Sequence, residues 1–180
     1  YKFTTLIKYL NKKSKKRYRY FTITDPTQYG TDTHFISFIV DSKSKVIYFF
    51  NPAIGSRGLC GTIADPFYYD SEKVVHKFFH DKKFQIIYYP MSCACQCTED
   101  DVYCQNWSLI TSIKAYPQIL AGKIKPLKIP SKKELRFNYI LEFWKSLLKN
   151  PDFCAKLQVQ YKVLRGSKGV INPENPNEAC

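Results

Sequence analysis

Two apolar runs joined by a short polar turn constrain the fold of this chain more than any other feature. The first run, HFISFIVD, begins at His34, and the second, VIYFFN, ends at Asn51. The residues between them, SKSK, are typical of a tight turn. The sequence therefore predicts a β-hairpin over residues 34–51. Because the two strands of a hairpin run in opposite directions, we expect His34 and Asn51 side by side at one edge of the sheet.

Other segments supply further strands and helices. Residues 18–24 are rich in β-forming residues, and FQIIYYP (84–90) predicts another strand that its proline ends. The segment YDSEKVVHKFFHDKK has apolar residues at helical spacing, with Asp70 or Ser71 as its N-cap. A further helix begins near Cys104. The order of these elements predicts an α+β fold, a small mixed sheet of three or more strands packed against several helices.

The C-terminal part of the chain divides into helices and a tail. The segment SKKELRFNYILEFWKSLLKN begins with Ser131 as a helix cap, and Glu134 completes a capping box. The next segment, PDFCAKLQVQYKVL, predicts one more helix, and residues 166–180 predict a flexible tail. We therefore expect a single domain over 1–165, which includes a basic segment at 1–19.

The charge of the chain is strongly positive, with 28 Lys and Arg against 15 Asp and Glu and a formal net charge of +13. It is concentrated at 122–137 and in an N-terminal run that contains Lys12, Lys13, Lys15, Lys16, Arg17 and Arg19. Such patches bind nucleic acid with a salt-dependent affinity, or they form a solvated face that keeps a protein soluble. The sequence leaves both interpretations open. No recognition helix, RNA-binding sheet or zinc finger accompanies the charge, so sequence-specific binding is not expected.

The chain contains seven cysteines and no segment that resembles a signal peptide or a membrane span. We therefore expect a soluble protein of a reducing compartment, with thiols that do not form disulfides. Three of the thiols form the cluster CACQC, at Cys93, Cys95 and Cys97. Its alternating spacing differs from the Cys-x-x-Cys of structural zinc sites, but a zinc-bound interaction module on these residues stays an alternative.

Four residues at element boundaries match the parts of a thiol-dependent catalytic site. A thiol nucleophile requires a base, a group that orients the base, and donors for an oxyanion. Cys104 lies at a helix start, where N–H groups and the helix dipole favour a thiolate. His34 is the candidate base, Asn51 the group that orients its ring, and Gln96 the oxyanion donor. Each of the four has an ordinary structural interpretation by itself, so the inference depends on their order and positions.

This order resembles that of the cysteine proteases related to the adenovirus maturation protease and the SUMO proteases. The resemblance rests on THFISFIVD, on VIYFFN, on IIYYP followed by Gln96, and on CQNWSL, and it covers residues 20–118. It includes an aromatic residue, Phe35, directly after His34. The resemblance implies a papain-like or adenain-like fold and the four catalytic roles given above. We expect no metal ion or cofactor in the site.

Three positions depart from the family pattern. Gln105 follows the nucleophile where family members usually have glycine, and the gap between the glutamine and the cysteine is longer than usual. Asn51 replaces the commoner aspartate. Because an amide carries no full charge, it stabilises a thiolate–imidazolium pair less strongly than a carboxylate does. Asp41 and Asp101 are alternative residues for the role of orienting the histidine.

The resemblance implies an endopeptidase or isopeptidase that cleaves after Gly-Gly, because the family's narrow cleft admits only residues without side chains. Its substrates are then viral precursor proteins or ubiquitin-like conjugates, in a virion or in the cytoplasm of a host cell infected by a large DNA virus. Two other classes stay open. One is a catalytically inactive relative or a basic nucleic-acid-binding virion protein, and the other is the zinc-bound module.

Overall fold

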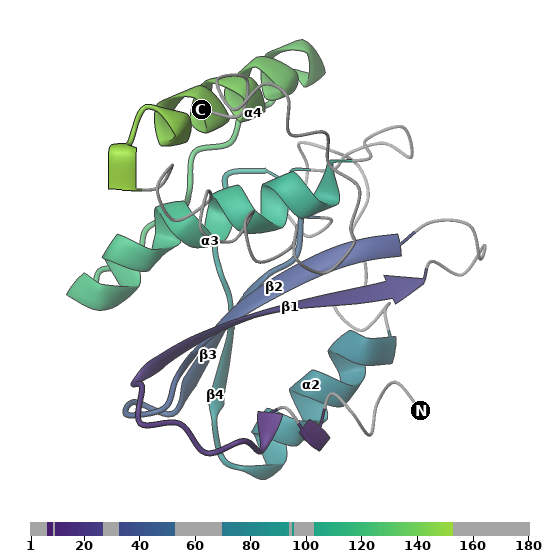
Figure 1. Cartoon of the computed structure of the whole chain (residues 1–180). Helices are drawn as coiled ribbons and strands as arrows, with labels where there is room; N and C mark the ends of the chain where they lie inside the picture. The colour runs from purple at the N-terminus through teal and green to yellow at the C-terminus, as the bar shows by residue number, and fades with distance from the viewer. Residues whose placement is uncertain are drawn as a thin grey trace, which may run out of the picture. The chain divides into compact units, whose positions relative to one another are not determined.

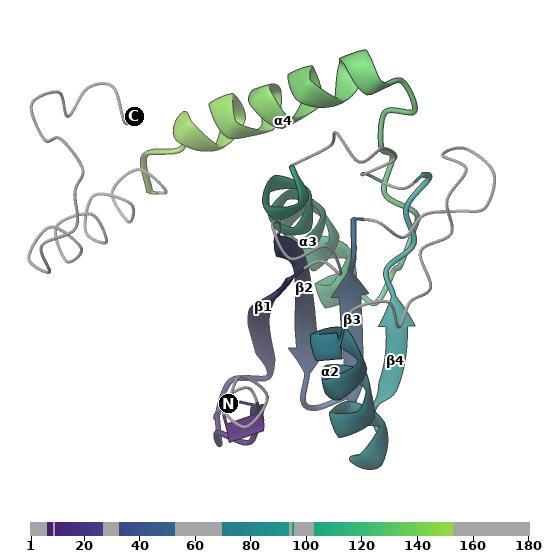
Figure 2. The same cartoon turned by 90° about the vertical axis from the view of Figure 1, so that its right-hand side faces the viewer.

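The computed structural model describes residues 7–8, 10–26, 33–52, 70–93, 95 and 103–152. The elements within these ranges are β1 (Tyr18–Pro26), β2 (Thr33–Asp41), β3 (Val46–Phe50), α2 (Asp70–Asp81), β4 (Gln85–Tyr88), α3 (Cys104–Ala121) and α4 (Lys133–Leu148). The strands form a four-stranded sheet in the order β1-β2-β3-β4 (Figure 1, Figure 2). The predicted α+β class is therefore confirmed.

The predicted hairpin over 34–51 is present as β2 and β3, which pair antiparallel. Asp41 closes the turn between them, because its carboxylate accepts the backbone N–H groups of Lys43 and Ser44 at 3.0 and 3.2 Å. β1 pairs antiparallel with β2, whereas β4 pairs parallel with β3. The sheet is therefore mixed, and its only parallel pair in the described ranges follows the crossover helix α2.

Alternate side chains of the hairpin pack on opposite faces of the sheet, and each face is covered by a helix (Figure 1). One face packs against α2 and forms a core of aliphatic and aromatic side chains, among them Ile36, Phe38, Val40, Ile47, Phe49, Val75 and Phe79. The other face packs against α3, whose Trp107 and Ile110 are fully buried. Burial of these apolar side chains on both faces is the main source of stability for the sheet.

The other predicted elements agree in position with the structure and differ only at their ends. β4 covers Gln85–Tyr88 rather than the whole of 84–90, and α4 begins at Lys133 rather than directly after Ser131. α3 begins at Cys104, as expected. The predicted tail and the helix predicted before it lie outside the described residues, except for the first two residues of that helix.

The chain divides into two compact units, Tyr1–Arg136 and Phe137–Cys180, and the boundary between them falls inside α4. The sheet, α2 and α3 belong to the first unit, which therefore contains all four predicted site residues. The expectation of one domain over 1–165 stays a prediction. None of the helices in the described ranges combines the length and apolar character needed to cross a membrane.

Candidate active site

The start of β2 and the end of β3 lie at the same edge of the sheet, where the sequence predicts the site. In the antiparallel register, Ser37 pairs with Phe50. One further step of this register brings Asn51 opposite Ile36. His34 is the second residue of β2 and precedes Ile36 by two residues, so it lies on the same face of the sheet. His34 and Asn51 are therefore diagonal neighbours, with Cα atoms about 7–8 Å apart, rather than directly opposite each other.

The N-terminus of α3 lies at this same edge, on the opposite face of the sheet from α2 (Figure 1). Two hydrogen bonds hold it there: Ser37 Oγ donates to the carbonyl of Ser108 at 2.8 Å, and Ser108 Oγ donates to the carbonyl of Phe35 at 2.7 Å. The C-terminal half of α3 lies over the far end of β1, where the rings of Tyr18 and Tyr116 are 5.8 Å apart. α3 therefore runs away from the predicted site, and its first residue precedes Ser108 by about one turn.

Cys104 is the first residue of α3, and the structure describes its backbone. The preceding residue, Tyr103, makes no side-chain capping hydrogen bond to the first turn. The N–H groups of a first turn and the helix dipole together favour negative charge at the N-terminal end of a helix. This end of α3 therefore suits a thiolate or an oxyanion.

Asn51 is buried at the end of β3 and contacts the first turn of α2. Its Nδ2 donates a hydrogen bond to Oε2 of Glu72 at 3.1 Å, and Glu72 is fully buried. Asn51 continues the alternation of Ile47 and Phe49, which pack in the core on the α2 side of the sheet. The position of Glu72 in the first turn of α2 favours a negative charge, because the helix dipole is positive at that end.

The contact with Glu72 fixes which way the amide of Asn51 points. The amide nitrogen Nδ2 faces the Glu72 carboxyl group, because it donates the hydrogen bond to Oε2. The carbonyl oxygen Oδ1 then points away from Glu72. A carbonyl oxygen is the group that accepts the ring N–H of a histidine, so this is the orientation that a Cys-His-Asn triad requires of its asparagine.

His34 lies in β2, where the structure describes its backbone. Asn51 faces α2, whereas Cys104 belongs to the helix on the other face of the sheet. Because Asn51 and Cys104 lie on opposite sides of the sheet, the three residues can meet only at the ends of the strands. His34 belongs to one of these last pairs, in which its partner on β1 is Asp25.

Two acidic residues beside the predicted site, Glu72 and Asp25, are not among the site residues that the sequence predicts. Glu72 precedes Val75 and Phe79 at helical spacing, so the pattern does assign it to the buried face of α2. Asp25 is the direct cross-strand partner of His34, but this becomes known only from the register of β1 against β2. Asp25 is therefore a second candidate for orienting the histidine.

Gln96 lies outside the described residues, but the segment that leads to it is held by the buried side chain of Arg136. Nη1 of Arg136 donates to the carbonyl of Cys95 at 2.9 Å, and Nε donates to the carbonyl of Pro130 at 3.0 Å. Its Nη2 lies 3.8 Å from Sγ of Cys93. Arg136 therefore ties the residue directly before Gln96 to the connector that leads into α4.

Asp41, an alternative partner for the histidine, lies at the far end of β2. Seven residues of extended chain separate it from His34, which corresponds to roughly 23 Å. Arg17 donates from Nε and Nη2 to the Asp41 carboxylate at 3.0 and 2.8 Å, and these bonds lower the pKa of Asp41 to about 2. Asp41 therefore stabilises the hairpin turn and is too distant to orient His34. Asp101 lies outside the described residues.

Two of the three clustered cysteines pack in the interior. Cys93 and Cys95 are buried, and Cys97 lies outside the described residues. Sγ of Cys93 lies 3.6 Å from the carbonyl of Ile129, and Sγ of Cys95 lies 3.6 Å from Sδ of Met91. Among the residues that the structure describes, no three His, Cys, Asp or Glu side chains are grouped so that they could hold a metal ion.

Comparisons of this chain with protein families, with curated proteins and with solved structures find no match. The positions of these residues, together with the order of motifs in the sequence, are therefore the basis for a functional inference.

Proposed function

We propose that this chain is a cysteine protease of papain-like or adenain-like fold, with Cys104 as the nucleophile and His34 as the base. Asn51 orients the imidazole, and Gln96 and the backbone N–H of Cys104 stabilise the oxyanion. The observation that supports this most is that three element ends share one edge of the sheet: the start of β2, the end of β3 and the N-terminus of α3.

In the proposed mechanism, His34 accepts the proton of Cys104, and the thiolate attacks the scissile carbonyl carbon to form a tetrahedral oxyanion. The imidazolium then donates its proton to the leaving amine as the C–N bond breaks, and a thioester remains. The imidazole next accepts a proton from water, which attacks the thioester. Release of the carboxylic acid product restores the thiol of Cys104.

The asparagine at position 51 has a physical reason in this proposal. An aspartate there would place a second carboxylate about 3 Å from that of Glu72 in a buried site, where two like charges repel strongly. The amide instead donates to Glu72 through Nδ2, and Oδ1 is the atom that would accept the ring N–H of His34. Glu72 is thus a positioning residue for Asn51.

The proposed substrates are polypeptides with Gly-Gly before the scissile bond, either viral precursor proteins or ubiquitin-like conjugates. The support for this class, and for a virion or the host cytoplasm as the location, is the resemblance of the sequence motifs. A thiol nucleophile also requires a reducing compartment.

The thiol chemistry is tested by the rate at which each cysteine reacts with iodoacetamide at pH 6, mapped by mass spectrometry. An unperturbed thiol is almost wholly protonated at this pH, whereas a thiolate paired with an imidazolium reacts rapidly. We expect fast alkylation of Cys104 and its loss in His34→Ala. The matched control is His80→Ala, because the His80 side chain is 74% exposed on α2.

Hydrolysis of a fluorogenic peptide with Gly-Gly before the coumarin leaving group then tests the substrate class. We expect activity in the wild type and in His80→Ala, and none in Cys104→Ala. If Cys104 reacts no faster than the other cysteines in the wild type, the protease proposal is wrong. If Cys104 is reactive but the Gly-Gly peptide is not cleaved, only the proposed substrate class is wrong.

A second candidate function is nucleic-acid binding by the N-terminal basic run. Arg17 binds Asp41, and Nη1 of Arg19 donates to the carbonyls of Leu10 and Lys12, so contacts within the fold hold these two side chains in place. The remaining cations of the run are exposed, namely Lys12, Lys13, Lys15 and Lys16. Four neighbouring exposed ammonium groups favour contacts with phosphates.

Fluorescence anisotropy with a labelled oligonucleotide at increasing salt tests this candidate. Replacement of these four lysines by glutamine should weaken binding and reduce its salt dependence. The matched control is the same replacement at four exposed lysines elsewhere in the first unit, Lys43, Lys45, Lys82 and Lys83. Equal losses in the two quadruple variants would mean that net charge, rather than this run, drives binding.

A further inference from the structure

An open groove runs between β1 and α3, on the face of the sheet that α3 covers. It encloses about 280 Å³, and mainly apolar atoms line it, from Tyr18, Tyr20, Leu109, Ile113 and Tyr116. Tyr20 is 46% exposed, and Ile113 and Tyr116 are each 39% exposed. Large apolar side chains that gather at a surface in this way mark a binding region.

β1 is one edge of the sheet, and within the described part of the chain it pairs with β2 alone. The N–H of Ser42 donates to the carbonyl of Arg17 at 2.9 Å, so these two residues form a hydrogen-bonded pair of the antiparallel ladder. Such pairs recur at every second residue, so the odd-numbered residues of β1 turn their backbone groups toward β2. Tyr20 and Thr22 turn their N–H and C=O groups outward, to the open edge.

The open edge and the groove are adjacent, because the residues with outward backbone groups also face α3. Tyr20 pairs with Ile39, which lines the groove, and Thr22 pairs with Ser37, which is bonded to α3. A ligand that uses both features must present a ladder of N–H and C=O groups and, at alternate positions, apolar side chains. An extended polypeptide has this pattern, and a nucleic acid does not.

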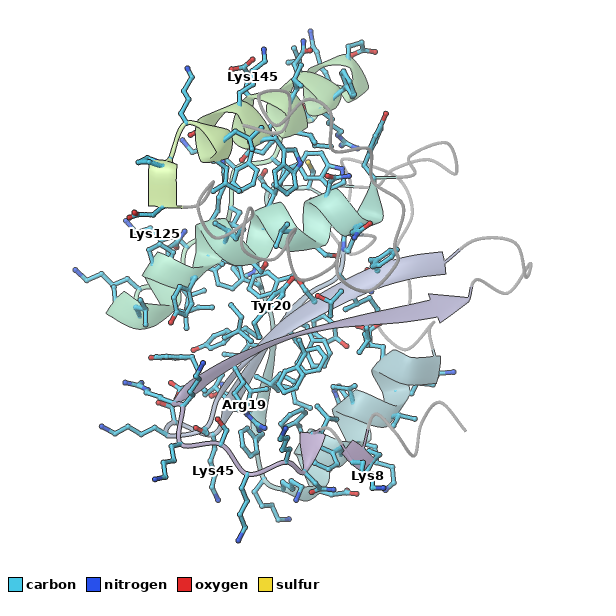
Figure 3. The ribbon with its side chains drawn as sticks, in the orientation of Figure 1. Lys8, Arg19, Tyr20, Lys45, Lys125 and Lys145 are labelled. Atoms are coloured by element: carbon cyan, nitrogen blue, oxygen red, sulfur yellow. The ribbon has the colours of Figure 1, made fainter. Side chains whose placement is uncertain are left out.

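The other side of β1 carries Arg19 beside the apolar residues Phe21 and Ile23. Figure 3 shows Arg19 and Lys8 on the α2 side of this strand and Tyr20 on the α3 side. The guanidinium of Arg19 lies 5.3 Å from the ring centroid of Phe21, and Lys8 is exposed. Side chains of an added strand that point to this side would meet positive charge. A second copy of the chain is a poor occupant, because each copy carries a net charge of +13.

We propose that the edge of β1 and the groove beside it bind an extended segment of an acidic partner polypeptide, which adds a strand to the sheet. Its apolar side chains lie in the groove beside Tyr20 and Tyr116, and its acidic side chains alternate with them and face Arg19. The backbone groups of Tyr20 and Thr22 form the ladder with the partner. This surface is separate from the thiol chemistry, so its test does not depend on activity.

The test measures amide hydrogen exchange in the full chain, with NMR as the readout. The probe is a mixture of nonapeptides, as long as the 9 residues of β1, with Glu at odd positions and Val, Ile, Leu, Tyr or Phe at even positions. In the free protein, the amides of Tyr20 and Thr22 should exchange rapidly and those of Arg19 and Phe21 slowly. The peptides should slow exchange at Tyr20 and Thr22 by about tenfold or more.

Two variants test the backbone edge of β1 and the apolar groove separately. Tyr20→Pro removes the outward N–H and the aromatic side chain at an edge position that tolerates proline. Ile113→Glu leaves the edge intact and introduces an acid into the groove. Each should weaken peptide binding by about tenfold or more. Tyr20→Pro removes a hydrogen bond and an aromatic contact, and Ile113→Glu places a carboxylate against the acidic peptide. The matched control is Phe137→Ala, whose side chain is 52% exposed outside the groove.

Four results would overturn the proposal. The first is slow exchange at Tyr20 and Thr22 in the free protein, which would mean that the edge is already paired. The second is equal binding of a mixture with Lys in place of Glu, and the third is no binding of the Glu mixture. The fourth is protection of the same amides by oligothymidylate but not by the peptides, which would assign the surface to nucleic acid.

Discussion

The side-chain amide of Asn51 donates a hydrogen bond to the carboxylate of Glu72 at 3.1 Å, in a place where both side chains are buried. The pair joins the end of β3 to the first turn of α2. The amide donor is neutral, so the glutamate is the residue that can carry a full charge in this contact. Glu72 determines the direction of the amide, and the amide provides Glu72 with a hydrogen bond that it needs in the interior.

Asn51→Asp is predicted to destabilise the protein in a pH-dependent way. The introduced carboxylate faces that of Glu72, so in the folded state the pKa of the pair rises above the values near 4 of the unfolded chain. The folded state then loses stability as the pH rises, by about 3 kcal/mol at pH 8. It recovers part of this loss at pH 5 and the rest as the pH falls to about 4. Urea unfolding of the variant and wild type at both pH values measures this effect.

The control for this prediction is Asn11→Asp, which makes the same chemical change at an exposed position. Its free energy of unfolding should stay within about 0.5 kcal/mol of the wild type at both pH values. An equal loss for Asn51→Asp at pH 5 and pH 8 would show that shape, and not charge, excludes aspartate.

Asn51 and Asp25 are competing partners for the histidine, and their substitution separates them. If Asn51 orients His34, Asn51→Ala lowers the alkylation rate of Cys104 at pH 6 by about tenfold or more, while Asp25→Asn changes it little. The readout is the pH profile of alkylation rather than stability, because a purely structural role would not move it. The opposite result would assign the orienting role to Asp25.

The hairpin and the start of α3 can be predicted from the sequence because their signals are local. The two apolar runs and the SKSK turn determine β2 and β3, and the apolar spacing after Cys104 determines the helix. The diagonal offset between His34 and Asn51 could not be predicted, because it depends on the register and not on strand length alone.

The partners of the buried charged residues could not be predicted for a different reason. Helical spacing places Glu72 on the buried face of α2, but burial of a charged residue requires partners from elsewhere in the chain. Glu72 accepts a hydrogen bond from Asn51 at the end of β3, and Arg136 donates one to the carbonyl of Cys95. These partners are distant in sequence, so only the tertiary structure identifies them.

The two serine hydrogen bonds are predicted to hold the N-terminal part of α3 against β2. Ser108→Ala removes the donor to the partly buried carbonyl of Phe35, which costs about 1–2 kcal/mol. The control is Ser112→Ala, because Ser112 Oγ is also buried but donates to Leu109 within the same helix at 2.8 Å. Both variants are compared by urea unfolding and by the alkylation rate of Cys104.

If α3 positions the thiol, Ser108→Ala slows alkylation of Cys104 and Ser112→Ala does not. An equal effect of the two variants on the alkylation rate would contradict the inference that the contact between α3 and β2 positions the candidate nucleophile.

Arg136 is predicted to hold the segment that contains Cys93 and Cys95 in its buried position. Arg136→Met leaves the carbonyls of Cys95 and Pro130 without this donor, at a cost of about 3 kcal/mol. Arg136→Lys should not rescue the loss, because an ammonium group lacks the planar fork that reaches both carbonyls. Alkylation of the buried Cys93 under native conditions should become faster in both variants. Unchanged protection of Cys93 would contradict this role.

The contact between Arg17 and Asp41 is predicted to make stability depend on pH in the acid range. Arg17 lowers the pKa of Asp41 from 3.8 to about 2 in the folded state, and the Asp41 side chain is only 4% exposed. Because the folded pKa is the lower one, the contribution is fully present above about pH 4 and is lost as the pH falls through 2. By linkage, the difference between the two pKa values corresponds to a contribution of up to about 2 kcal/mol to the free energy of unfolding.

Urea unfolding of the wild type and of Asp41→Asn between pH 5 and pH 2 measures this contribution. The variant should lose the Arg17 contact at every pH, so its stability is lower at pH 5 and approaches that of the wild type near pH 2. The control is Asp81→Asn, because Asp81 forms a 3.2 Å pair with Lys77 that is largely exposed. Surface pairs of this kind contribute about 0–1 kcal/mol, so this variant should follow the wild type. Parallel curves for Asp41→Asn and wild type would mean that Asp41 stabilises the turn through its shape rather than its charge.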